Sequence, residues 1–159
     1  EEINPLPYQH LFFTANRYAD PYRILKQNES IKLTTEKEVL LVTGIANPQP
    51  LKDLLHDNSK AYNMLHYTDH YIFSIDDWKE IKKRFENMES KQTIILTTEK
   101  DAVRLVKFGE ELSTIPLYVI PIEHYFLFNE GDFFLEIVTK FIEHPPLPLP
   151  GGDANTQTR

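Results

Sequence analysis

Between residues 38 and 144 the sequence alternates short apolar runs with amphipathic segments, and this alternation constrains the fold more than any other feature. The run at 38–45 (EVLLVTGI) is rich in leucine and β-branched residues, as in a strand buried on both faces. Further apolar runs at 61–68, 93–98 and 116–122 predict three more strands. Because strands that alternate with helices form mostly parallel sheets, we predict an α/β domain around a sheet of about four strands.

The predicted helices have recognisable start signals. Ser74 with Asp77, and Thr98 with Asp101, have the spacing of a capping box. The helix after Ser74 continues as a single apolar stripe that we expect to face the core: Trp78, Ile81, Phe85 and Met88.

Two asparagines are predicted to cap the other helices. Asn47 should cap the helix after the first strand, with Pro48 in its first position. Asn129 should cap the last helix, with Asp132 at the third position, and this helix should end before Pro145. Its apolar residues are expected to face inward: Phe134, Ile137, Val138, Phe141 and Ile142.

The sequence is predicted to divide into three parts. Residues 1–37 should form an N-terminal ribbon or linker region, with two short strands at 10–14 and 30–35. Residues 38–144 should form the α/β domain. The proline- and glycine-containing segment 145–159 is predicted to be a disordered tail.

Glycine is scarce, with only five in 159 residues, and this limits the nucleotide chemistry that the chain can perform. Gly151 and Gly152 lie in the predicted tail, while Gly44, Gly109 and Gly131 are too far apart for G-x-G-x-x-G or a P-loop. A glycine-rich phosphate cradle must therefore lie on another segment. Without cysteine, disulfides and thiolate metal sites are also excluded.

The net charge of −7 argues against a broad surface for nucleic acid, so we predict no nucleic-acid partner. No apolar run approaches the roughly 20 residues needed to span a bilayer, so no transmembrane segment is expected. The chain begins with Glu rather than Met, and we expect it to be a piece of a longer protein.

Polar residues follow three of the predicted strands. The carboxyl ends of parallel strands are where ligands collect in an open sheet, so we predict the functional site there. The candidates are Thr43, Gly44 and Asn47 after the first strand, Asp69 and His70 after the second, and Thr98, Glu99, Lys100 and Asp101 after the third.

His70 is the most reactive candidate, because histidine titrates near neutrality and can move protons. The alternative is a loop histidine bonded to backbone. Asp69 is expected to orient the loop backbone rather than His70, since adjacent residues of an extended segment point opposite ways. Lys100 opposes the dipole at a helix N-terminus, which indicates a nearby anion or a salt bridge with a neighbouring carboxylate. The N–H groups after Asn47 could hold an anion or simply begin a helix.

A metal site built from His66, Asp69 and His70 is a minor alternative, which would make the chain a His/Asp metallohydrolase. Tyr67 replaces the glutamate of H-E-x-x-H, and the pair lies where a strand passes into a loop, so the two rings should not converge. We predict no metal site in this chain.

Three motifs in order carry a resemblance to a known family: V-T-G-I-A-N-P at 42–48, D-H at 69–70 and T-E-K-D-A-V at 98–103. Together they resemble the C-terminal half of tetraacyldisaccharide 4′-kinase, the lipid A 4′-kinase of Gram-negative bacteria, over about residues 1–144. One departure is Thr68, where family members often have proline before the D-H pair.

The resemblance implies a P-loop kinase that transfers the γ-phosphate of ATP to the 4′-hydroxyl of a tetraacyldisaccharide 1-phosphate, the lipid A precursor. It implies a cytoplasmic enzyme, peripheral at the inner membrane, whose N-terminal P-loop domain holds most of the ATP and Mg²⁺. His70 matches a histidine thought to support an N-terminal aspartate base, with Asp69 supporting. This chain alone would then be inactive. The alternative is a free-standing α/β module that binds a small anion or a partner without catalysis.

Overall fold

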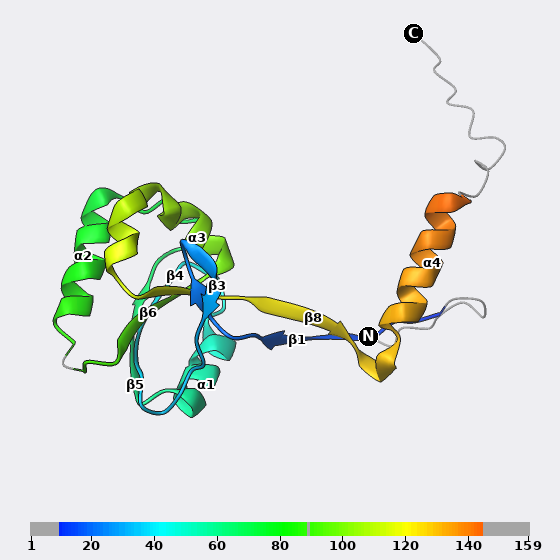
Figure 1. The fold of residues 1–159 in the computed structure, drawn as a ribbon, viewed down its shortest axis with the longest axis horizontal. Helices are drawn as coiled ribbons and strands as arrows, with labels where there is room; N and C mark the ends of the chain where they lie inside the picture. Colours follow the sequence, from blue (N-terminus) through cyan, green and yellow to red (C-terminus); the bar gives the residue numbers. More distant parts are fainter. Residues whose placement is uncertain (1–9, 89, 145–159) are drawn as a thin grey trace, which may run out of the picture. The chain divides into compact units, whose positions relative to one another are not determined.

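A computed structural model of the chain describes residues 10–88 and 90–144. Contacts divide the chain into two compact units (Figure 1). One comprises the described residues of Tyr18–Glu123, and the other combines the described residues before Tyr18 with those after Glu123. The predicted tail at 145–159 lies outside the described residues.

The larger unit contains a six-stranded sheet in the order β3-β2-β7-β6-β4-β5. Four neighbouring strands run parallel, which confirms the predicted class: β4 (Glu38–Thr43), β5 (Ala61–His66), β6 (Thr93–Thr98) and β7 (Leu117–Ile120). Two further strands, which were not predicted to belong to this sheet, extend it antiparallel: β2 (Tyr22–Arg23) and β3 (Lys26–Ser30). The helical segments are α1 (Gln49–Asn58), α2 (Ile75–Glu86), α3 (Glu99–Leu105) and the 3₁₀ segment η1 (Val106–Thr114).

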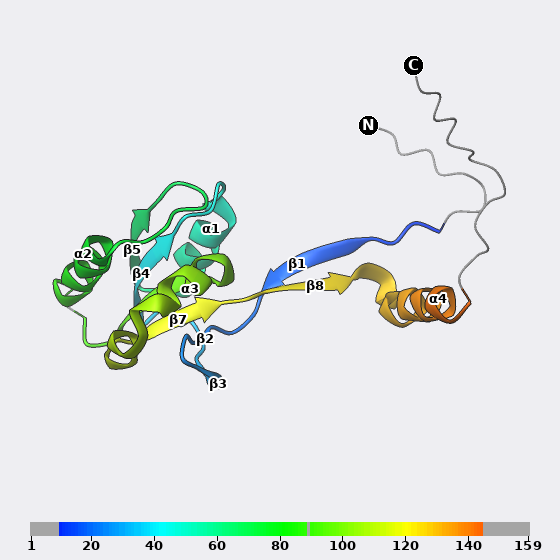
Figure 2. The ribbon, with the colours of Figure 1, turned by 90° about the horizontal axis from the view of Figure 1, so that it is seen from above.

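The core lies on both faces of this sheet, because successive residues of a buried strand point to opposite sides. Leu40 and Val42 of β4 face one cluster, which also contains Trp78 of α2 and Leu105 of α3. The alternate residues of β4 face a second cluster with α1. Figure 2 shows α2 and α1 on opposite sides of β4. The sheet edge from which the loops emerge is therefore held by helices on both faces.

The predicted helix starts are right in one place and wrong in another. Ser74 and Asp77 form the complete capping box of α2. Asn47 does not cap α1, whose N-cap is Pro48 in a helical conformation. Instead the Asn47 side chain accepts a hydrogen bond from the backbone N–H of Gln49 at 3.1 Å, which closes a turn just before the helix.

The smaller unit contains α4 (Gly131–Glu143) and η2 (Leu127–Asn129), which follow a two-stranded sheet of β1 (Thr14–Tyr18) and β8 (Ile122–Phe126). The predicted ribbon of 10–14 with 30–35 is wrong, because β1 pairs with β8 from the far end of the chain. The predicted strand at 30–35 lies earlier, at β3, and pairs with β2.

Two predictions for α4 are wrong: its N-terminal cap and the burial of its apolar face. Its N-cap is Glu130 without a side-chain bond, since Asn129 adopts a left-handed conformation with φ of 60°. No residue of α4 is buried, and Phe141 and Ile142 are 60% and 71% exposed. The apolar stripe exists, but the described residues cover only part of it: the ring of Phe134 packs against those of Phe12 and Phe126, whereas the C-terminal half of the stripe is exposed. The helix ends at Glu143, before Pro145 as predicted.

Candidate functional site

The carboxyl ends of β5, β4 and β6 lie side by side, because these strands are consecutive and parallel in the sheet. The loops after β4 and β5 and the first turn of α3 therefore meet at one edge. This is the edge at which the sequence predicts the site.

The carboxylate of Asp101 joins two of these strand ends. It is fully buried, and its Oδ2 accepts hydrogen bonds from the Thr43 hydroxyl at 3.1 Å, the Gly44 N–H at 3.0 Å and the Thr98 hydroxyl at 2.8 Å. Thr98 Oγ1 also accepts from the Asp101 N–H, as a cap should. The side chain of Asp101 completes no capping box, because it reaches across to the neighbouring strand. Asp101, Thr43 and Thr98 are therefore internal supports of the site.

Gly44 is required by close packing. A Cβ at this position would lie 2.9 Å from the Thr68 carbonyl oxygen and 3.2 Å from Asp101 Oδ1. Only glycine lets the loop after β4 approach the loop after β5 this closely. Two further bonds hold these loops together: the Tyr67 N–H donates to Thr43 O at 2.9 Å, and His66 Nε2 lies 3.1 Å from Ile45 O.

An aromatic cluster anchors the loop that carries His70. The Tyr67 ring lies 4.7 Å from the ring of Tyr71 and 5.0 Å from that of Phe73. The Tyr71 hydroxyl donates to the Asp77 carboxylate at 3.1 Å, which ties the loop to the first turn of α2. Burial, with nearby carboxylates, raises the pKa of Tyr67 to about 12, so this side chain stays neutral.

Asp69 and Lys100 form a salt bridge across the site, which is the second alternative that the position of Lys100 predicts. Lys100 Nζ donates to Asp69 Oδ1 at 2.5 Å, and the same oxygen accepts from the His70 backbone N–H at 3.0 Å. The Lys100 ammonium lowers the pKa of the Asp69 carboxyl below its ordinary value, assisted by the His70 N–H. Asp69 thus holds the backbone of the loop.

The His70 ring is presented to solvent, with a side-chain exposure of 72%. Its backbone adopts a φ of 60°, a left-handed conformation that is unusual outside glycine. Nδ1 lies 3.3 Å from Arg104 Nη2, and Nε2 lies 3.6 Å from Asp69 Oδ2, beyond hydrogen-bond range. Because Nδ1 is next to Arg104, Nε2 is the ring nitrogen that has no hydrogen-bond partner among the described residues.

Arg104 was missed by the sequence reasoning, although its spacing offers a signal. It lies three residues after Asp101 and four after Lys100, so all three share one face of α3. Asn47, in contrast, is exposed and bonds within its own turn.

A largely apolar pocket of about 310 Å³ opens beside the first turn of α3. Its lining includes Tyr18, Ile45, Ile120 and Ile122, and the polar residues Thr98, Glu99 and Lys100. Glu99 Oε2 also accepts from the Ile122 N–H at 3.4 Å. The predicted residues Thr98, Glu99 and Lys100 therefore border a hollow at the strand ends.

Among the described residues there is no group of three or more His, Asp or Glu that could hold a metal ion. His66, Asp69 and His70 are engaged separately, with the Ile45 carbonyl, with Lys100 and with Arg104.

Comparison with known proteins decides the family. A family model described as "Tetraacyldisaccharide-1-P 4'-kinase" matches residues 4–142. The chain belongs to this kinase family. The tetraacyldisaccharide 4′-kinases of Bacteroides fragilis and Phocaeicola vulgatus are 32% and 33% identical to it, over 89% of the chain in each case. The chain spans about 40% of the length of these relatives.

A solved structure of the same family shares the fold. The crystal structure of "apo" form LpxK from Aquifex aeolicus in complex with ATP superposes with a TM-score of 0.52 at 16% identity. The match covers 87% of this chain and 39% of that one. Among the helices described here, none is long and apolar enough to cross a membrane.

Proposed function

We propose that the chain is the C-terminal part of a kinase that transfers the γ-phosphate of ATP to the 4′-hydroxyl of tetraacyldisaccharide 1-phosphate. The family match over residues 4–142 carries this proposal, and the relatives bear the name of that activity. The chain spans about 40% of their length, and its sequence has no P-loop. The isolated chain is therefore expected to be inactive.

In this proposal, ATP is bound mainly by an N-terminal P-loop domain. Mg²⁺ prefers carboxylate and phosphate oxygens, and the described residues offer no cluster of carboxylates for it. The Asp69 carboxylate is engaged by Lys100, and that of Asp101 is buried under its own donors. We therefore place the Mg²⁺ ligands in the N-terminal domain, where the ion would neutralise charge on the phosphates.

The contribution of this chain is His70 at the strand-end edge. Phosphoryl transfer depends on positioning and charge stabilisation more than on covalent chemistry. An exposed imidazole held by its neighbours can hydrogen-bond an aspartate base from the N-terminal domain and orient that base toward the sugar hydroxyl. Asp69 supports His70 through its backbone bond. The neighbouring loops, including Glu99 and Lys100, would form the wall of the cleft.

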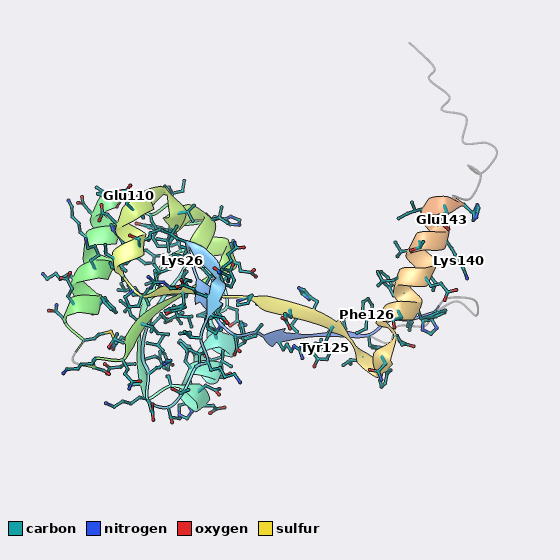
Figure 3. The ribbon with its side chains drawn as sticks, viewed as in Figure 1. Lys26, Glu110, Tyr125, Phe126, Lys140 and Glu143 are labelled. Atoms are coloured by element: carbon teal, nitrogen blue, oxygen red, sulfur yellow. The ribbon has the colours of Figure 1, made fainter. Side chains whose placement is uncertain are left out.

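The smaller unit supplies a surface for the N-terminal domain. Apolar side chains are exposed along α4 and in the segment before it, among them Phe128 at 78% and Leu135 at 60%. Figure 3 shows Tyr125 and Phe126 on β8, and Lys140 and Glu143 on α4. An apolar surface of this kind marks an interaction site in soluble proteins. We propose that the N-terminal domain covers it, and that the whole enzyme works at the cytoplasmic face of the inner membrane.

The test is His70→Ala in the full-length kinase. We expect turnover to fall by about a hundredfold or more, because a positioned acid–base group contributes about that factor. Folding should be preserved, since the ring is exposed. His56→Ala is the matched control, because His56 is exposed on α1 and contacts only its neighbour Asp57 among the described side chains. Unchanged turnover in the His70 variant would refute the role of this residue.

A further inference from the structure

Arg104 connects the exposed ring of His70 to the buried carboxylate of Asp101. Its Nη1 donates to the Lys100 carbonyl at 3.0 Å and lies 3.6 Å from Asp101 Oδ1. Its Nη2 lies 3.3 Å from His70 Nδ1. The side chain is only 24% exposed, so the guanidinium lies between the interior and the ring.

The buried carboxylate of Asp101 holds the guanidinium of Arg104, and its two oxygens differ in their hydrogen bonds. Asp101 Oδ2 receives three hydrogen bonds, whereas Oδ1 is buried and has no hydrogen-bond donor among the described residues. Arg104 supplies the nearest positive charge to this oxygen. Because a buried charge is costly without a counter-charge, the pair holds Arg104 in place.

The chemistry of arginine then determines which nitrogen of His70 carries the proton. A guanidinium has only donors, so His70 Nδ1 must be the acceptor in this contact. A neutral imidazole that accepts at Nδ1 carries its proton on Nε2. Nε2 belongs to a side chain that is 72% exposed, and it lies 3.6 Å from Asp69 Oδ2, too far for a hydrogen bond. Its N–H is free to donate to an incoming anionic oxygen.

The backbone of His70 is also held by its neighbours. A non-glycine residue at φ of 60° is strained and needs support from its surroundings. Asp69 Oδ1 accepts from the His70 N–H, and Lys100 fixes Asp69 in turn. Two separate contacts, one on the backbone and one on the ring, therefore set the direction of Nε2.

We propose that Arg104 is a positioning residue that fixes His70 as an Nε2–H donor toward an anionic oxygen acceptor. The identity of that acceptor, a carboxylate base or a phosphate, rests on the proposed function. The tautomer and the orientation of the His70 ring are independent of the proposed function. A purely structural Arg104 would stabilise Asp101 and leave the imidazole unaffected.

The first test is ¹⁵N NMR of the histidine rings in the 159-residue chain at a pH of about 8.5, where histidine is neutral. Wild-type His70 should show an unprotonated Nδ1 and a protonated Nε2. In Arg104→Met the Nδ1 resonance should move toward that of a free imidazole nitrogen. Arg84→Met is the matched control, because Arg84 lies on α2 and pairs with Glu80, and it should leave these resonances unchanged.

Two outcomes would overturn the proposal: a proton on Nδ1 in the wild type, or ring resonances that Arg104→Met leaves unchanged. If this variant does not fold, the wild-type spectrum still decides the tautomer. Arg104→Lys then tests the orientation of the His70 ring. Lysine keeps the positive charge, but its single ammonium cannot contact Asp101, Lys100 and His70 at once as the planar guanidinium does. We expect a partial shift of Nδ1 in the lysine variant.

The second test is kinetic and uses the full-length kinase. Arg104→Met should lower kcat by about tenfold to a hundredfold with KM near the wild-type value, as expected when a reacting group is misplaced. Combined with His70→Ala, it should cause no further loss, because Arg104 acts through His70. Additive losses would refute this coupling. If His70→Ala alone had no effect, the proposed function would fail, while the NMR result would still decide the tautomer.

Discussion

Removing the carboxylate of Asp101 should be among the most destabilising single changes at the site. Three donors converge on its Oδ2: the hydroxyls of Thr43 and Thr98, and the Gly44 N–H. Arg104 lies 3.6 Å from the other oxygen. Asp101→Ala leaves these donors and a mostly buried guanidinium without their acceptor. Because breaking a buried ion pair on one side costs about 3–5 kcal/mol, we expect a loss of that size in the free energy of unfolding.

Asp101→Asn separates the cost of losing the hydrogen-bond acceptor from the cost of losing the counter-charge of Arg104. The amide oxygen can take the place of Oδ2 and keep the three donors satisfied, while the amide nitrogen meets Arg104. The loss is then mainly that of the counter-charge, about 1–3 kcal/mol. The order wild type, asparagine, alanine is the specific expectation.

Chemical denaturation measures both effects, because a change in midpoint at constant m-value reports stability alone. Asp76→Ala is the matched control, since Asp76 is an exposed carboxylate on α2 that pairs with Lys79. Its midpoint should stay close to that of the wild type. If Asp101→Ala behaved like this control, the buried carboxylate would not join β4 to α3.

Three further predictions concern other parts of the chain. Gly44→Ala should destabilise the chain by about 1–3 kcal/mol, since its Cβ would meet a backbone oxygen at 2.9 Å, whereas the same change at Gly131 meets only an aromatic ring at 3.4 Å; thermal denaturation compares them. Lys100→Met should raise the pKa of Asp69 toward its ordinary value in a carboxyl NMR titration. Because the pKa of Asp69 is lowered in the folded chain, its pair with Lys100 contributes stability at pH values above the unfolded pKa. The difference in free energy of unfolding between variant and wild type should therefore shrink as the pH falls through the folded pKa. Phe141→Glu should leave the stability of the chain unchanged, because Phe141 is 60% exposed, but should weaken binding of the separately expressed N-terminal domain in calorimetry.

The parts of the fold that the sequence predicts correctly depend on local signals. The capping box of Ser74 and Asp77 is complete within four residues, and the apolar run of β4 needs no partner to indicate burial. The pairing of β1 with β8 failed as a prediction because its two strands are separated by most of the chain. A polar strand carries no sign of such a distant partner.

The side chains of the site also have partners that local sequence signals do not indicate. Asp101 has the correct cap spacing, yet its carboxylate bonds Thr43 and Gly44, which the local pattern cannot indicate. The face of α4 was predicted to be buried from its periodicity alone. Periodicity shows that a helix has an apolar face and does not show what covers it. In both places the missing information was the identity of a non-local partner.

Two carboxylates in opposite environments make α3 the centre of the site. Buried Asp101 binds the end of β4 to α3, while half-exposed Asp69 binds the loop after β5 to Lys100 of the same helix. Arg104 lies between the two arrangements and contacts His70. All five positions belong to the unit Tyr18–Glu123, so His70 is oriented within that unit alone. A change at Asp101 should therefore alter the ring of His70 as well as stability, whereas a change at the exposed Phe141 of α4 should alter neither.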